Sequence, residues 1–219
     1  MPRPELPRHQ LVRIRPQAWD RLLASRPDLA GESLLPGWAA RGWPLIARRA
    51  LPEENAEELT LGLPLPPSAG KRRIAVQLQP ADIASSAPLP ELAQAADAAP
   101  QAWRTCLLEL SDIAARYEVR LRVFGSLAWQ HLTGLTYLGP GSDLDLTWTL
   151  PRRNHIGPLL AELAQLEARA PMRLDGELVR ADGAGVNWRE VHAGASELAL
   201  KTAAEVVLCP IDDFVGEAA

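Results

Sequence analysis

The stretch Arg122-Val-Phe-Gly125-Ser126, followed after a gap by Gly141-Ser142-Asp143-Leu144-Asp145-Leu146, decides the expected fold of this chain. Residues 143–150 (DLDLTWTL) alternate between polar and apolar side chains, which predicts a strand with one polar and one buried face. Asp143 and Asp145 share the polar face, about 6–7 Å apart along the strand. Carboxylates at this separation repel each other unless a cation lies between them, and Mg2+ prefers such oxygen ligands. A metal site is therefore expected where this strand begins.

A second polar feature lies upstream of the two acids. Residues 119–123 alternate between apolar and basic side chains, which predicts a strand that leads into Gly125-Ser126. The backbone N–H groups and hydroxyl of such a turn suit a phosphate, and glycine allows the phosphate a close approach. A short helix is expected over 127–133 and a loop over 134–141. Metal-binding carboxylates beside a phosphate-binding turn indicate phosphoryl or nucleotidyl transfer.

The rest of the chain predicts an α/β (α+β) fold, with a mixed sheet and flanking helices in the second half. Apolar residues at helical spacing predict helices over 102–117 and around 159–166. A hairpin is expected from 173–180 and 185–189, followed by short strands at 197–201 and 205–208. Before these elements, we expect a short helix at 19–23, strands at 44–49 and 73–78, and an extended connection over 60–67.

Prolines and alanines in the middle of the chain indicate a division into two domains. We expect a small N-terminal α+β domain over residues 1–80, a Pro/Ala-rich linker over 81–100, and a catalytic domain over 101–219.

Composition limits the class of protein. The chain has 219 residues, a net charge of −4 and only two cysteines, Cys106 and Cys209. So few cysteines, at no metal-ligand spacing, are expected to be reduced structural thiols, and we expect a cytoplasmic protein. No apolar run reaches the roughly 18 residues that a membrane span needs. Residues 1–80 hold 12 basic and 8 acidic side chains. This small excess of positive charge does not indicate binding to duplex DNA, which would need a much stronger basic surface.

A strand ending in Gly-Ser, a short helix and a strand beginning Asp-x-Asp resemble the nucleotidyltransferase superfamily. The run Val123 to Gly134, followed by Gly141 to Leu146, looks like a narrower family, the holo-acyl-carrier-protein synthases of malonate decarboxylase, also called phosphoribosyl-dephospho-CoA transferases. The segments 42–45 (GWPL), 174–178 (LDGEL) and 187–190 (NWRE) carry the same resemblance.

This resemblance implies a nucleotidyltransferase-like catalytic domain that attaches a prosthetic group to a carrier protein. The donor would be 2′-(5″-triphosphoribosyl)-3′-dephospho-CoA, and the acceptor a serine of the apo acyl-carrier subunit of malonate decarboxylase. Diphosphate would be released. Asp143 and Asp145 would be the catalytic residues and would bind Mg2+, while Gly125 and Ser126 would bind the triphosphate.

Two further site residues are expected from the second half of the chain. Nucleotidyltransferases often carry a third acid on a neighbouring strand, for which Asp175 is the candidate and Glu177, on the same face, the substitute. Asp175 is equally compatible with a solvated position beside Gly176. Lys201 is the only lysine in this half and suits a phosphate, or alternatively an exposed strand position.

Two other functions remain open at this stage. One is a nucleotidyltransferase that uses ATP or another nucleoside triphosphate on a small-molecule or protein acceptor. The other is a non-catalytic module that binds a carrier protein. The intact Gly-Ser turn and acid pair disfavour the second of these.

Overall fold

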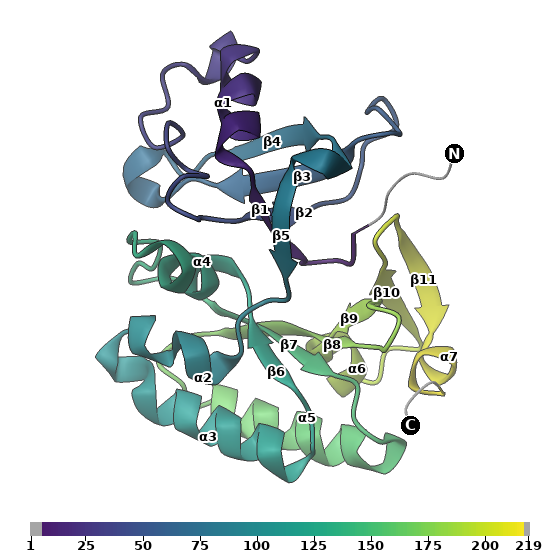
Figure 1. The fold of residues 1–219 in the computed structure, drawn as a ribbon. Coiled ribbons are helices and arrows are strands. Elements are labelled where there is room, and N and C mark those ends of the chain that lie inside the picture. The colour runs from purple at the N-terminus through teal and green to yellow at the C-terminus, as the bar shows by residue number, and fades with distance from the viewer. Residues whose placement is uncertain (1–5, 217–219) are drawn as a thin grey trace. The chain divides into compact units, whose positions relative to one another are not determined.

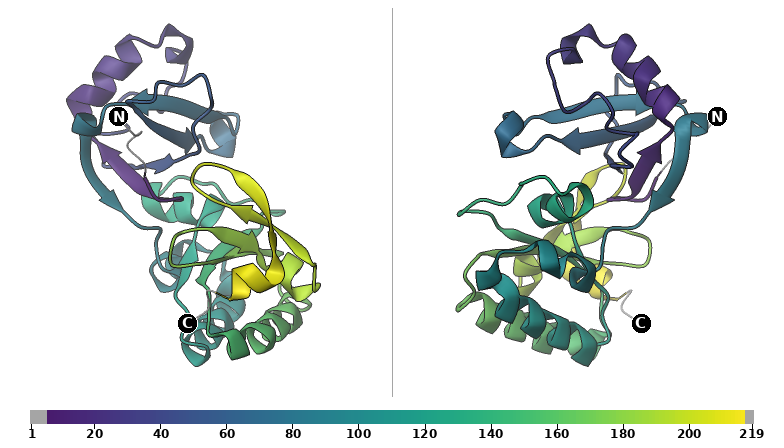
Figure 2. Two further views of the ribbon diagram at one scale, coloured as in Figure 1. Left: turned by 90° about the vertical axis from the view of Figure 1, so that its right-hand side faces the viewer. Right: turned by 60° about the vertical axis from the view of Figure 1, so that its left-hand side comes forward.

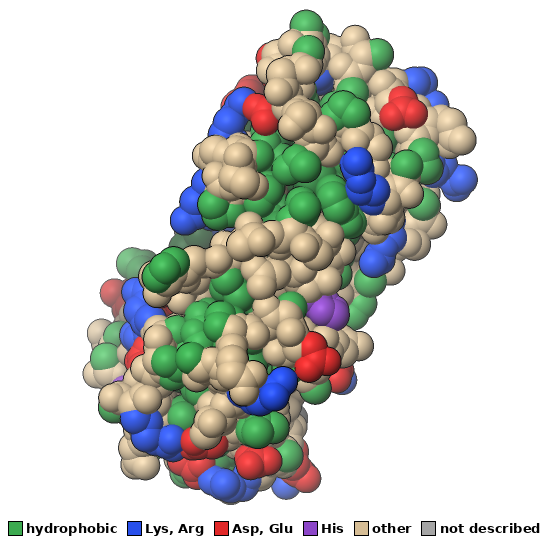
Figure 3. Space-filling model, turned by 90° about the vertical axis from the view of Figure 1, so that its left-hand side faces the viewer, with side chains coloured by type: hydrophobic (Ala, Val, Ile, Leu, Met, Phe, Trp, Pro, Cys, Tyr) green, Lys and Arg blue, Asp and Glu red, His purple; other side chains and the backbone are tan. Residues whose placement is uncertain are grey.

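The computed structural model describes residues 6–216, and the chain divides into two compact units between Leu89 and Pro90. The outer ends of the two expected domains, residues 1–5 and 217–219, lie outside the described residues. Each unit contains one β-sheet with its own helices, so both have mixed α and β structure, as predicted (Figure 1). In Figure 3, basic and acidic side chains are interspersed over the visible face of each unit.

The first unit is an antiparallel five-stranded sheet in the order β4-β3-β2-β1-β5. Trp19 anchors its longest helix, because the indole is fully buried and its Nε1 donates to the Leu35 carbonyl at 2.8 Å. The elements are β1 (Leu11–Ile14), α1 (Pro16–Ala24), η1 (Pro27–Leu29), β2 (Leu45–Ala47), β3 (Leu59–Pro64), η2 (Pro67–Ala69), β4 (Arg73–Leu78), η3 (Pro80–Asp82) and β5 (Ile83–Ala87).

The expectation of an extended connection over 60–67 was wrong, because most of this segment is the interior strand β3. The prolines of this segment suggested a connection, although Leu59, Leu61 and Leu63 alternate with Thr60 and Gly62 as in a strand, and residues 59–63 are all buried. The proline within β3, Pro64, is its last residue, where a missing N–H costs the ladder least.

The segment expected as a linker is instead divided between the two units. Residues 83–87 form β5, which pairs with β1 through backbone hydrogen bonds that need no apolar pattern. Beyond the division, Leu92 and Ala95 of α2 are buried in the core of the second unit. A capping box between Glu91 and Gln94 begins this helix.

The second unit contains a six-stranded sheet in the order β11-β10-β9-β8-β7-β6, in which β7 and β8 are parallel and the other neighbours antiparallel. Its elements are α2 (Leu92–Ala95), η4 (Ala96–Ala98), η5 (Gln101–Trp103), α3 (Arg104–Arg116), β6 (Leu121–Val123), α4 (Gly125–Thr133), β7 (Leu144–Thr149), α5 (Arg153–Glu167), β8 (Leu174–Val179), β9 (Gly185–Asn187), α6 (Trp188–His192), β10 (Glu197–Lys201), β11 (Val206–Pro210) and α7 (Ile211–Val215).

The alternating side chains of β7 lie on two different sides of the sheet, with the apolar ones in the core of the unit. Leu144, Leu146 and Trp148 are fully buried, as predicted, and belong to one core cluster with the apolar faces of α3 and α5. Figures 1 and 2 show these two helices together on one side of the sheet. The acids of β7 therefore project from the opposite side.

A close contact explains the glycine of β8. A Cβ atom on Gly176 would lie 2.4 Å from the Leu146 carbonyl oxygen and 2.4 Å from the Trp148 ring. Glycine thus leaves room for the Trp148 ring, the largest core side chain of β7, against the neighbouring strand.

Candidate functional site

The Gly-Ser pair is the first turn of α4 rather than a turn preceding it. The helix starts at Gly125, two residues earlier than predicted, directly after β6. Gly125 has φ +59°, and a Cβ atom there would lie only 1.8 Å from Oδ2 of Asp145. Glycine is therefore required at this position for two reasons, the left-handed backbone and the space that the Asp145 carboxylate occupies.

The carboxyl of Asp145 has a raised pKa. Burial, followed by the charges of Asp175 and Asp143, raises the pKa of its carboxyl from 3.8 to about 6. A backbone hydrogen bond from Ser126 and the charge of Arg173 act in the opposite direction. The first turn of α4 thus already directs an N–H group at a carboxylate, in the way that it would meet a phosphate oxygen.

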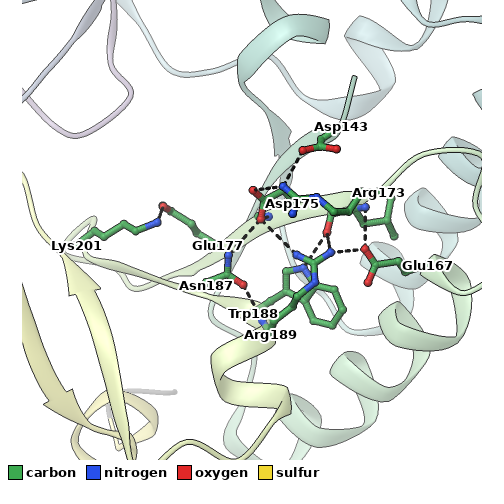
Figure 4. Close-up of polar contacts among 11 residues, drawn as sticks. Asp143, Glu167, Arg173, Asp175, Glu177, Asn187, Trp188, Arg189 and Lys201 are labelled. Carbon is green, nitrogen blue, oxygen red and sulfur yellow. Dashed lines mark hydrogen bonds and ion pairs between the residues drawn. The ribbon is translucent and has the colours of Figure 1, made fainter. Parts of the chain in front are cut away.

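The third acid expected from the sequence lies beside the first two. In the parallel register of β7 and β8, Asp145 is directly opposite Asp175. The Arg173 Nη2 atom lies 2.7 Å from Oδ2 of Asp143 and 3.4 Å from Oδ2 of Asp175 (Figure 4). The structure therefore brings the three predicted acids together and places a guanidinium between two of them.

A network around Arg189 holds Asp175 from its other side. Asp175 Oδ1 accepts from Asn187 Nδ2 at 3.1 Å and from Arg189 Nη1 at 3.4 Å. Arg189 also donates to Glu167 of α5 and, at 2.7 Å, to the Leu174 carbonyl, and its guanidinium lies over the Trp188 ring (Figure 4). These contacts orient the Asp175 side chain on the sheet.

The sequence placed residues 185–189 in a hairpin strand and gave 187–190 a family resemblance, but the strand ends at Asn187, α6 follows it, and the roles of Asn187 and Arg189 were missed. Asn187 also caps α6, because its side chain accepts from the Arg189 N–H at 2.9 Å. An asparagine directly before a short helix was the available signal for that second role.

The structure places Lys201 of β10 beside Glu177 of β8. Its Nζ lies 2.8 Å from Oε1 of Glu177, whose side chain is only 6% exposed. Glu177, the substitute for the third acid, thus has a lysine partner. A phosphate-binding role for Lys201 remains a prediction.

Gln130 of α4 holds the loop that leads from this helix to Asp143, a role that was not predicted from the sequence. Its Oε1 accepts from the backbone N–H groups of Tyr137 and Leu138 at 3.0 and 3.1 Å, while its Nε2 donates to Ala98. Ser142 closes the end of the loop by accepting from the Gly139 N–H. These contacts position the chain directly before Asp143.

The donor set of the cluster fits Mg2+, since all three acids offer carboxylate oxygens, the ligands that this ion prefers. In the arrangement seen here, no group of three or more His, Cys, Asp or Glu side chains among residues 6–216 is close enough to hold a metal ion. The guanidinium of Arg173 contacts Asp143 and Asp175.

Comparisons with known proteins cover nearly the whole chain. Residues 7–88 match the model of the phosphoribosyl-dephospho-CoA transferase MdcG N-terminal domain, and residues 91–212 match that of the C-terminal domain. A protein of Bradyrhizobium diazoefficiens named phosphoribosyl-dephospho-CoA transferase is 50% identical over 211 residues, which cover 96% of this chain and 93% of the relative.

Proteins of the same name in Xanthomonas are more distant. That of Xanthomonas campestris pv. campestris strain 8004 is 38% identical, covering 80% of this chain and 86% of the relative. That of Xanthomonas axonopodis pv. citri is 37% identical, covering 93% of each chain. No solved structure matches. None of the helices within residues 6–216 combines the length and apolar character needed to cross a membrane.

Proposed function

The chain belongs to the phosphoribosyl-dephospho-CoA transferase family, and from this premise we propose the transfer that it performs. The donor is 2′-(5″-triphosphoribosyl)-3′-dephospho-CoA, and the acceptor is a serine hydroxyl of the apo acyl-carrier subunit of malonate decarboxylase. The observation that carries this proposal is the 50% identity to a protein of that name over 96% of the chain.

The proposed reaction is a displacement at the phosphorus nearest the ribose. The serine O–H bond and one phosphoanhydride bond break, a phosphodiester forms, and diphosphate and a proton are released. This is nucleotidyl transfer in chemical type, because the nucleotide-like group moves and diphosphate leaves.

The geometry of the second unit supports this chemistry. Asp143, Asp145 and Asp175 are the residues that would hold Mg2+, which would supply positive charge to the phosphates. Asp145 lies in β7 and Asp143 directly precedes that strand, while Asp175 lies in β8 and is held by the Asn187 and Arg189 contacts, so the two neighbouring strands position the acids.

The start of α4 supports a phosphate position beside these acids. Gly125 presents no side chain, and the first turn of a nine-residue helix has N–H groups without intrahelical partners. Ser126 already uses its N–H on Asp145, so the contact that we propose for a donor phosphate involves the remaining groups of this turn and the Ser126 hydroxyl.

Intact-mass spectrometry of the apo carrier subunit tests the proposal. The carrier is incubated with the protein, Mg2+ and the triphosphoribosyl donor, and the Asp145→Asn and Asp112→Asn variants are run in parallel. We expect a mass gain equal to the phosphoribosyl-dephospho-CoA group with the wild type and with Asp112→Asn, which changes an exposed acid of α3. Asp145→Asn should give no gain.

A parallel incubation with ATP in place of the donor separates the proposed reaction from ordinary nucleotidyl transfer. Addition of AMP to the carrier without addition of the larger group would overturn the donor assignment. Full modification by Asp145→Asn would overturn the acid site.

A further inference from the structure

The position of Arg173 is the feature that the proposed reaction leaves unexplained. This residue immediately precedes β8, and its side chain is 57% exposed. In the described part of the chain, the hydrogen bonds of this side chain are those to Asp143 and Asp175. An exposed basic side chain thus contacts two of the three acids that we propose as metal ligands.

The other basic side chains around the acids are engaged elsewhere. Arg189 is only 34% exposed and contacts Glu167 and the Leu174 carbonyl in addition to Asp175. Lys201 pairs with Glu177. Arg173 is therefore the exposed cation at this cluster, and few contacts would be lost if its side chain turned away.

The contacts of Arg173 conflict with metal binding at the same atoms. Oδ2 of Asp143, 2.7 Å from the guanidinium, cannot face both Arg173 and a divalent cation without strong repulsion between the two positive groups. A metal ion at these acids would displace the guanidinium, which would then lie within a side-chain length of the phosphates that the metal ion binds. Guanidinium groups match phosphate oxygens through paired N–H donors.

We propose that Arg173 is an exchangeable counter-ion: it neutralises Asp143 and Asp175 when no divalent cation is bound, and it binds the diphosphate portion of the donor once the cation replaces it. This inference rests on the proposed function, since it takes the acids as metal ligands and a diphosphate as leaving group. It assigns a donor-binding role to a residue outside the Gly-Ser and Asp-x-Asp motifs.

The proposal predicts opposite effects of one substitution on two ligands. Without the guanidinium, a divalent cation alone meets less repulsion and binds more tightly. Diphosphate, in the presence of the same cation, loses a partner and binds more weakly. A purely structural role of Arg173 would instead weaken both or neither.

Binding of Mn2+ to the full chain, followed by the electron paramagnetic resonance signal of the free ion, measures the first effect. Arg173→Gln should bind Mn2+ about tenfold more tightly than the wild type, as expected for removal of a unit charge near a divalent ion. Arg173→Lys keeps the charge and should stay near the wild type. Arg169→Gln is the matched control, because Arg169 pairs with the distant Glu109.

Isothermal titration with inorganic diphosphate at saturating Mg2+ measures the second effect. We expect binding to Arg173→Gln to be weaker by about tenfold, the loss of one charge-assisted contact, and binding to Arg169→Gln to be unchanged. Mn2+ affinity of Arg173→Gln at or below the wild-type value would overturn the exchange, and unchanged diphosphate affinity would overturn the donor-binding role.

The Asp145→Asn variant separates failure of this inference from failure of the metal site. Wild-type binding of Mn2+ that is lost in Asp145→Asn but unaffected in Arg173→Gln would overturn only the role of Arg173. Absence of Mn2+ binding by the wild type and by Arg173→Gln would overturn the metal site, and the inference with it.

Discussion

Replacement of Gly125 by alanine should damage both the stability of the protein and its acid site. The new Cβ atom would lie 1.8 Å from Oδ2, 2.6 Å from Cγ and 3.1 Å from Cβ of Asp145. Rotation of the carboxylate alone relieves the first contact but not the last. The Asp145 side chain must therefore leave its position, and the acid cluster changes shape.

The expected loss of stability has two parts. Alanine at φ +59° costs about 1 kcal/mol of backbone strain. Displacement of Asp145 also removes the hydrogen bond from Ser126 and disturbs packing, which adds about 2 kcal/mol. The total is a decrease of about 3 kcal/mol in the free energy of unfolding, measured by urea denaturation.

Gly134→Ala is the matched control at the other end of the same helix. Gly134 has φ +72°, and no atom lies within 4 Å of the position of its Cβ. This substitution should cost about 1 kcal/mol for strain alone and leave Mn2+ binding intact. In an Asp145→Ala background, Gly125→Ala should also approach this smaller cost, because Oδ2 and Cγ are absent.

Equal losses for Gly125→Ala and Gly134→Ala would refute this reasoning, as would wild-type Mn2+ affinity of Gly125→Ala. Either result would mean that the α4 start and the Asp145 carboxylate adapt to a side chain between them.

Three further substitutions test the electrostatics and packing of the second unit. The raised pKa of Asp145 means that folding favours its protonated form, so its contribution to stability is complete below pH 4 and is lost as the pH rises through 6. Relative to Asp145→Asn, the wild type should lose about 3 kcal/mol between pH 4 and 7.5 in urea denaturation without metal. Gly176→Ala should destabilise by about 3 kcal/mol, because a backbone carbonyl and the Trp148 ring leave no room for a methyl group. Lys201→Met should lower the free energy of unfolding by about 2 kcal/mol, since the buried Glu177 carboxylate loses its cation.

For each of these three predictions, a control variant or an opposite outcome tests the reasoning. A wild type and Asp145→Asn that follow parallel pH profiles would contradict the raised pKa. Gly157→Ala is the control for Gly176, because Gly157 lies on α5 with open space around it, and alanine there should stabilise by about 0.5–1 kcal/mol. If Lys201→Met keeps full stability but loses diphosphate affinity, Lys201 binds phosphate as the sequence first indicated.

Strands with a strict alternation of polar and apolar residues were predicted correctly from the sequence. Alternation along residues 143–150 identified β7 and the side of the sheet on which Asp143 and Asp145 lie. Prolines at its end led β3 to be predicted as a connection, although its leucines alternate along residues 59–63, and β5, which is mostly exposed and lacks an apolar pattern, was predicted as part of a linker.

In the acid site, too, the local sequence pattern predicted part of the arrangement and the pairing of strands determined the rest. The Asp-x-Asp pair lies on one strand, so spacing alone places its two carboxylates on one face. Asp175 joins them only because β7 and β8 are parallel neighbours in a register that sets it opposite Asp145. Arg173, Asn187 and Arg189 reach the cluster through the same register and the β8–β9 hairpin.

The sequence by itself determined the acid pair, the Gly-Ser pair that follows a strand, the amphipathic elements and the resemblance to a transferase family. These depend on residues close together in the chain, whose spacing translates directly into a shared face. Only the tertiary structure decided which carboxylates meet, that a guanidinium lies between two of them, and that Gly125 makes room for Asp145. The contacts of Asp145 with Asp175, of Arg173 with Asp143 and of Gly125 with Asp145 join residues 20 or more positions apart, and the pairing and packing of strands, which the local pattern does not encode, bring them together.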